Sequence, residues 1–190
     1  MRSALRSSNP PAGAVARTAW TPNRFTGEDV IAILRERGWL AGEESDALRT
    51  WCARAAELLG PQAADRAALA ALLQPVFAYD AKAALEDTAN QDVLSRSGAR
   101  EVIRELANRI LDGGDIDSDR FKQMIEELKL AVPQRSRELF HPIRLALTGH
   151  FGEGQLDRVI LLLDSAAQLK FASPVKTNRQ RMLEFCAALE

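Results

Sequence analysis

The chain has 190 residues, of which 46% are hydrophobic, so it is long and apolar enough to bury a core in one domain or two small ones. Its formal net charge is only −1, distributed as +3 over residues 1–40, −6 over residues 41–132 and +2 over residues 133–190. This composition excludes the dense basic surface on which most nucleic-acid binding depends, so any contact with RNA must be local.

Residues 1–26 predict a disordered tail that is basic and rich in Ser, Pro and Gly, with no acidic residue before Glu28. An organelle transit peptide has the same composition, but Pro10, Pro11 and Gly13 interrupt the amphipathic helix that it requires. A linker from an upstream domain fits equally well, so the three interpretations stay open. The basic residues of the segment are Arg2, Arg6, Arg17 and Arg24.

Residues 27–88 predict a first helical subdomain, because strand-forming residues are sparse and apolar residues recur at three- and four-residue spacing. Trp51 falls on the apolar face of its helix, where a core anchor is a better interpretation than a base-stacking platform. Capping residues and breakers set the ends of the helices. The expected helices are Thr26 to Gly38, about Glu44 to Leu59, Asp65 to Pro75, and residues 80–86.

Residues 88–92 form a polar break, which places the start of a second helical subdomain at residue 89 and extends it to residue 190. The glycine-rich segment 149–154 is expected to be a loop. The expected helices are residues 98–111, residues 117–130, Pro142 to Leu147 with the proline at its start, residues 155–163, and a last helix capped by Thr177. The inward residues of the last helix are expected to be Met182, Leu183, Cys186 and Leu189. The fold class is therefore all-α, with two consecutive helical bundles.

No pattern for catalysis, for a cofactor or for a metal stands out. The 149–154 loop lacks the Lys-Ser/Thr ending of a phosphate-binding loop, and His141 and His150 form no metal-ligand spacing with the two distant cysteines. The sequence has no secretory signal, and Cys52 and Cys186 are far apart in it, so we expect free thiols in the reducing cytoplasm. We also see no apolar run long enough to cross a membrane.

Arg144 is the one basic residue within the apolar segment from Pro142 to Leu147. A guanidinium in such a place is either paired with a carboxylate or presented to an anionic ligand or to the edge of a base. The residues themselves favour the carboxylate pair.

The segment Phe140-His141-Pro142-Ile143-Arg144-Leu145-Ala146-Leu147-Thr148-Gly149 resembles the Pro-Leu-Arg-Val-Ala-Leu-Thr-Gly segment in the carboxy-terminal anticodon-binding domain of bacterial glutamyl-tRNA synthetases. The helix after it, which holds Leu156, is also similar. Residues 54–62 and 75–80 look like the ends of two helices in that domain, and the remaining helices occur in matching order. The resemblance therefore covers roughly residues 28–190.

The resemblance implies the two helical bundles of a class I synthetase anticodon-binding domain, which recognises the splayed bases of a tRNA anticodon by their edges. In that family the motif arginine, here Arg144, lines the base pocket, and a later leucine, here Leu156, packs against a base. We expect Gln62 at the edge of this pocket, and we expect the neighbouring Arg135 and Arg137 to contact phosphates.

Three positions depart from the family pattern. Gln62 stands where the family has an arginine that distinguishes glutamate from glutamine anticodons, so the resemblance implies a tRNA of either the glutamate or the glutamine type. Gly60 replaces the other arginine of that turn. Glu153, a carboxylate, stands where the family pocket offers a threonine, and it would face phosphate-rich RNA.

The catalytic signatures of the family, His-x-Gly-His and Lys-Met-Ser-Lys-Ser, are absent from this sequence. We therefore predict a tRNA-binding module that does not aminoacylate by itself and needs no cofactor. It is either a free-standing paralogue or the severed tail of a synthetase, and its expected partners are a tRNA and a separate catalytic chain. The competing hypothesis is a protein-interaction or regulatory domain that kept this fold and lost RNA binding.

Overall fold

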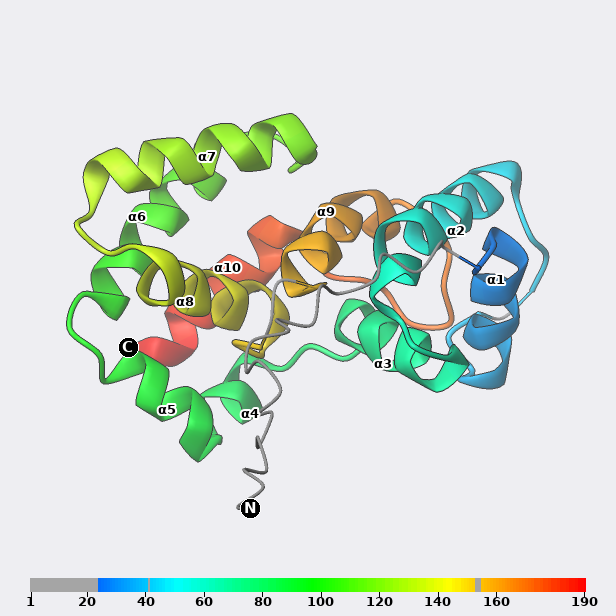
Figure 1. The fold of residues 1–190 in the computed structure, drawn as a ribbon, viewed down its shortest axis with the longest axis horizontal. Coiled ribbons are helices and arrows are strands. Elements are labelled where there is room, and N and C mark those ends of the chain that lie inside the picture. The colour runs from blue at the N-terminus through cyan, green and yellow to red at the C-terminus, as the bar shows by residue number, and fades with distance from the viewer. Residues whose placement is uncertain (1–23, 41, 153–154) are drawn as a thin grey trace, which may run out of the picture.

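The computed structural model describes residues 24–40, 42–152 and 155–190, and within these ranges it contains helices and no strand (Figure 1). The prediction of an all-α fold is confirmed. The elements are α1 (Gly27–Glu36), α2 (Asp46–Leu59), the 3-10 turn η1 (Gly60–Gln62), α3 (Arg66–Phe77), α4 (Ala81–Glu86), α5 (Thr88–Leu94), α6 (Ala99–Leu111), α7 (Ser118–Ala131), α8 (Ser136–Thr148), α9 (Gln155–Ala167) and α10 (Asn178–Leu189).

Most helices begin where a short polar side chain can accept a hydrogen bond from a free backbone N–H. Thr26 and Thr177 form full capping boxes with the residues three positions later, Asp29 and Gln180. Asp117 caps α7 in the simpler way, through its carboxylate. These starts were predicted because capping is a local property of the chain. The predicted tail lies almost wholly in residues 1–23, outside the described residues.

Three predicted boundaries are wrong. Pro142 does not start a helix but lies in the middle of α8, which begins at Ser136, and Pro75 lies inside the last turn of α3 instead of closing it. Both prolines are buried, so packing of the helix face compensates for the backbone hydrogen bond that each proline removes. The expected polar break at residues 88–92 is the start of α5, which Asp87 caps.

The helices surround two clusters of buried apolar side chains. The first cluster is built by α1, α2 and α3, and the second by α4 to α8 and α10. Helix α9 lies between them, as Figure 1 shows: Val159 and Leu162 belong to the first cluster and Ile160 to the second. The boundary of two subdomains at residue 88 stays a prediction.

A fully buried arginine ties the elements together where the clusters meet. The Arg181 guanidinium donates to the carbonyls of Pro75, Val76 and Leu147 at 2.7–3.0 Å, so it joins the ends of α3 and α8 to α10. It lies 4.7 Å from the centroid of the Tyr79 ring, whose hydroxyl donates to the Ala146 carbonyl. Burial lowers the pKa of Arg181 to about 10, which leaves it protonated at neutral pH.

Across the described ranges, we find no helix that is both long and apolar enough to span a membrane.

Candidate nucleic-acid interface

The Arg144 side chain is held by a carboxylate and a backbone carbonyl. Its Nε and Nη2 donate to the two Asp157 carboxylate oxygens at 2.7 and 2.9 Å, and its Nη1 donates to the Gly152 carbonyl at 2.9 Å. The two side chains are 11% and 23% exposed. Such a two-pronged pair between Arg144 on α8 and Asp157 on α9 fixes the guanidinium plane and the loop between the helices. The interpretation of Arg144 as a residue paired with a carboxylate is therefore confirmed.

Five N–H groups belong to a guanidinium, and these contacts use three of them. The two remaining N–H groups, one on each Nη, have no hydrogen-bond acceptor among the residues that the structure describes. Arg144 can therefore keep its hold on Asp157 and still donate to a ligand that reaches its exposed edge.

Side chains suited to RNA gather on one side of α8. Arg137, Phe140, His141 and Arg144 follow one another at three- and four-residue spacing, so they share a side of the helix, which we call the α8 outer face. Arg137 is exposed and makes no ion pair or hydrogen bond with any described residue. Phe140 is half-buried, and the Arg144 guanidinium lies 5.3 Å from the centroid of its ring.

The loop after α8 adds a second ring to this face. Gly149 has a φ of +80°, a left-handed conformation that ends the helix and that glycine adopts without strain. The loop then returns along α8, so that the rings of Phe151 and His141 lie 5.2 Å apart. The Arg96 Nη1 is 3.2 Å from the His141 Nδ1. The half-buried rings of Phe140 and Phe151 and the guanidinium groups of Arg96 and Arg144 thus lie along α8 and the loop after it.

Leu156 and Gln62, the other residues expected in a pocket, belong to α9 and to η1, respectively. Leu156 is 9% exposed and packs with the first cluster, beneath Gly152. Arg158 donates to the Leu58 carbonyl at 2.9 Å, which holds the turn that carries Gln62 beside α9. Gln62 itself is exposed. The structure therefore brings the motif segments together, but Leu156 can meet a base only if the loop above it moves.

Arg135 binds the backbone carbonyls at the end of α7. Its guanidinium donates to the carbonyls of Lys129, Val132 and Gln134 at 2.6–2.7 Å. These carbonyls lie at and just beyond the end of α7, where a cation is favoured by the helix dipole. Arg137, in contrast, makes no such contact with a described residue, so its guanidinium can bind a ligand. Glu153, the expected unfavourable carboxylate, lies outside the described residues.

Sequence reasoning missed several residues of this face. Asp157, Arg96 and Phe151 come from other elements, and only folding brings them to α8. The spacing of Phe140 and Arg144, one helical turn apart, could have indicated that the two side chains lie together.

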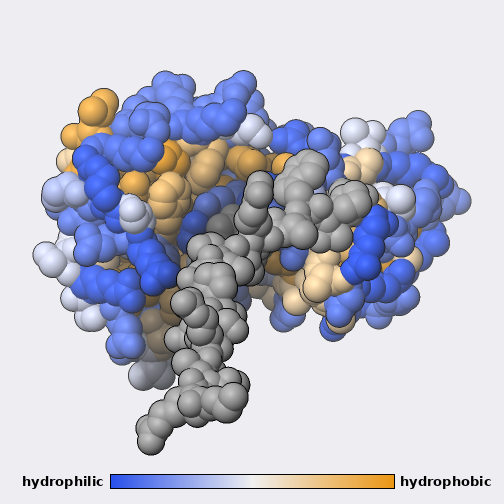
Figure 2. Space-filling model, viewed as in Figure 1, coloured by the Kyte–Doolittle hydropathy of each residue, from blue (hydrophilic) through white to orange (hydrophobic). Residues whose placement is uncertain are grey.

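Figure 2 shows that the visible surface is largely hydrophilic, with apolar side chains gathered between α7 and α8. A search of the described part of the chain for groups of His, Cys, Asp and Glu able to hold a metal finds none.

Comparison with known proteins gives a partial similarity. The chain is 30% identical to a glutamate–tRNA ligase from Heliobacterium modesticaldum over 89 residues, which are 47% of this chain and 18% of that ligase. The matched part is thus less than a fifth of the ligase. No family model matches the chain, and no solved structure matches it.

Proposed function

We propose that the chain is a non-catalytic tRNA-binding module of the glutamate–tRNA ligase type, which binds the anticodon loop of a glutamate or glutamine tRNA on the α8 outer face. Its helices then form the two bundles of a class I synthetase anticodon-binding domain, and aminoacylation is the task of a separate catalytic part. The partial similarity to a glutamate–tRNA ligase supports this proposal. The observation that carries it is the combination of unpaired Arg137, the oriented Arg144 and two half-buried rings on one face.

This combination suits a single-stranded loop better than a duplex. Unstacked bases gain affinity by stacking on aromatic rings, and Phe140 beside Arg144 and Phe151 beside His141 offer such rings. The two remaining Nη donors of Arg144 suit a base edge, while Arg137 and Arg96 suit phosphates. Gln62 and, after movement of the loop, Leu156 extend the site toward α9. Arg135 contributes to the local positive potential without giving up its helix contacts.

Arg137→Glu tests the proposal most cleanly, because Arg137 has no partner whose loss would unfold the protein. Fluorescence anisotropy follows the binding of a labelled anticodon stem-loop at about 50 mM salt, where phosphate contacts are strong. We expect the reversal to weaken binding by about tenfold, which corresponds to about 1.4 kcal/mol. The competitor is a stem-loop with the same stem and an unrelated loop.

Arg37→Glu is the matched control. Arg37 is also exposed, but it follows α1 at the opposite end of the molecule from α8 (Figure 1). The two variants carry the same change in net charge, so a general electrostatic effect lowers both affinities equally. Equal loss in both variants, or no preference of the native chain for the anticodon loop over the competitor, rejects the proposal.

A protein-interaction domain without RNA binding is the second candidate. The pairing of Arg144 with Asp157 favours it, because this pair neutralises the most embedded cation of the face. The net charge of −6 over residues 41–132 also opposes a polyanion. If this candidate is right, neither the native chain nor Arg137→Glu binds any of the stem-loops, and the two proteins are equally stable.

A further inference from the structure

Helix α10 presents an apolar side to solvent near its end. Leu183, Cys186, Ala187 and Glu190 follow at three- and four-residue spacing and share one side of the helix. Leu183 is 49% exposed, although an inward position was predicted for it. Only one other large apolar side chain of the described residues, Leu130 on α7, is classed as exposed. A single exposed leucine is ordinary on a protein surface, but here it lies on the same side of the helix as Cys186 and Ala187, and a contiguous apolar patch of this kind is what a partner covers.

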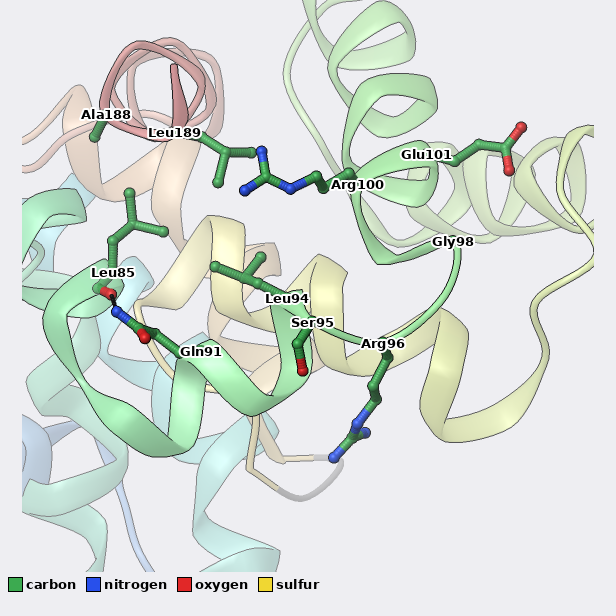
Figure 3. Close-up of a pocket in the computed structure, with 10 residues that line it drawn as sticks. All are labelled: Leu85, Gln91, Leu94, Ser95, Arg96, Gly98, Arg100, Glu101, Ala188 and Leu189. Carbon is green, nitrogen blue, oxygen red and sulfur yellow. Dashed lines mark hydrogen bonds between the residues drawn. The ribbon is translucent and has the colours of Figure 1, made fainter.

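Two hollows flank the end of α10, and Arg100 and Leu189 line both of them; the smaller one also reaches Cys186 and Glu190 on the exposed side of the helix. The larger one, of about 850 Å³, has Leu85 and Leu94 opposite Ala188 and Leu189 (Figure 3). The smaller one, of about 360 Å³, has Ile103, Ala107 and Cys186 among its lining residues. Figure 3 shows the Arg100 side chain reaching toward Leu189, whereas Glu101 and Arg96 point away from the hollow. The larger hollow therefore has four aliphatic side chains among polar ones, and the Arg100 side chain lies beside Leu189 at its edge.

Charges of both signs border these hollows. Arg100 on α6 makes no ion pair with any residue that the structure describes. Arg104, one turn later, is 69% exposed and only 3.8 and 4.0 Å from the carboxylates of Glu101 and Glu105. Glu190 at the end of α10 lines the smaller hollow with them. We call the surface made by Arg100, Arg104, Leu183, Cys186, Leu189 and Glu190 the α6–α10 face.

We propose that the α6–α10 face binds the same face of a second copy of this chain. A two-fold axis repeats every contact, so a face that carries both an aliphatic ridge with hollows and both signs of charge complements itself. The apolar side of α10, led by Leu183, covers the smaller hollow of the partner. Arg104 of each copy then pairs with the partner's Glu190, and the reciprocal contact forms twice.

Other occupants fit this face less well. RNA is disfavoured because no aromatic ring lines either hollow and because Glu101 and Glu190 border them. The amino-terminal segment of the same chain is disfavoured because it carries Arg2, Arg6 and Arg17 without an acidic residue, the same sign as the cations of α6. The second copy is therefore the occupant that both the apolar surface and the charges support. This inference does not depend on RNA binding.

Analytical ultracentrifugation of the full chain under reducing conditions tests the proposal. A small, partly charged interface predicts a weak, reversible dimer, so we examine protein concentrations from about 1 to 500 μM. Leu183→Glu places a carboxylate in the centre of the contact and is expected to weaken association by at least about tenfold. Leu130→Glu, which replaces the 90% exposed leucine of α7, is the matched control and leaves association unchanged.

A charge exchange tests the pairing itself. Arg104→Glu is expected to weaken association, and the addition of Glu190→Arg restores it, because each copy then offers the reversed pair to its partner. Restored association in the double variant cannot come from a change in the fold of one copy alone, provided that circular dichroism shows equal helix content in all variants.

Alkylation of thiols gives an independent readout. Cys52 is fully buried, and burial raises its pKa to about 12, so Cys186 is the thiol that reacts. Reaction of Cys186 is expected to slow as the protein concentration rises through the association range. A chain that stays monomeric to the highest concentration, equal effects of Leu183→Glu and Leu130→Glu, or a concentration-independent alkylation rate each overturn the proposal.

Discussion

The pair of Arg144 and Asp157 permits a quantitative prediction, because its partial burial places it between two known limits. Exposed ion pairs contribute about 0–1 kcal/mol, whereas breaking a buried pair costs about 3–5 kcal/mol. At 11% and 23% exposure, with two short contacts, the pair belongs between these limits. We expect an interaction free energy of about 2 kcal/mol from a double-mutant cycle of Arg144→Ala and Asp157→Ala.

The two single variants are expected to differ in the unfolding free energy that each one loses. Arg144→Ala also loses the hydrogen bond to the Gly152 carbonyl and the contact with the Phe140 ring, so it is expected to cost about 3 kcal/mol of unfolding free energy. Asp157→Ala leaves the guanidinium with the carbonyl alone and is expected to cost about 2 kcal/mol. Urea unfolding at pH 7, followed by circular dichroism, measures the midpoints and slopes of all four proteins.

The native chain, Arg144→Ala and a further variant, Asp157→Asn, separate structure from recognition. Under the proposed function, Arg144→Ala loses about tenfold in affinity for the anticodon stem-loop, while Asp157→Asn, which keeps an acceptor and removes a charge, changes it by less than about threefold. An interaction free energy below about 0.5 kcal/mol would refute the stabilising role of the pair, since such a value is typical of exposed ions. Full RNA affinity in folded Arg144→Ala would show that this guanidinium holds the loop and does not contact RNA.

Three further outcomes follow from the structure. Arg181→Met removes the donors for three buried carbonyls, and each unsatisfied buried acceptor costs about 1–3 kcal/mol. Burial of the methionine side chain offsets part of this loss, so we expect the unfolding free energy to fall by about 4 kcal/mol in urea titrations. Hydrogen bonds from Thr26 lower the pKa of the Asp29 carboxyl below 3.8. The ionised carboxylate therefore stabilises the fold above pH 3.8, and this stabilisation is lost as the pH falls. The difference in unfolding free energy between the native chain and Asp29→Asn should shrink below pH 3.8. RNA affinity should fall with salt with a logarithmic slope of about −2, from the few cations of the α8 outer face and Arg96; a slope of −5 or steeper would place the binding on another basic segment.

The features that could be predicted from the sequence are those that depend on near neighbours. The capping boxes at Thr26 and Thr177 and the core position of Trp51, whose indole N–H donates to the Leu162 carbonyl, follow from short motifs and from helical spacing. Such signals do not need the rest of the fold. They fix which residues are helical and which side of each helix is apolar.

The features that could not be predicted depend on contacts between distant segments. The partner of Arg144 lies thirteen residues later, across a loop, and the spacing alone gives no reason to choose Asp157. The inward side of α10 was wrong at Leu183, because the helix turns to bring Arg181 to three carbonyls of α3 and α8. A cationic side chain thus decides the orientation of a helix whose apolar pattern is weak, and no propensity scale records that preference.

The two arginines connect the core to the candidate interface. Arg181 binds the Leu147 carbonyl, and Tyr79 binds the Ala146 carbonyl, so the last turn of α8 is fixed from beneath, immediately before the Gly149 turn. Arg144 fixes the far side of the same loop through Gly152. The position of Phe151 against His141 therefore depends on α3, α9 and α10 together, and an isolated α8 peptide would carry the motif residues without the face that they form. If this chain binds an anticodon loop, it does so as an assembled helical unit.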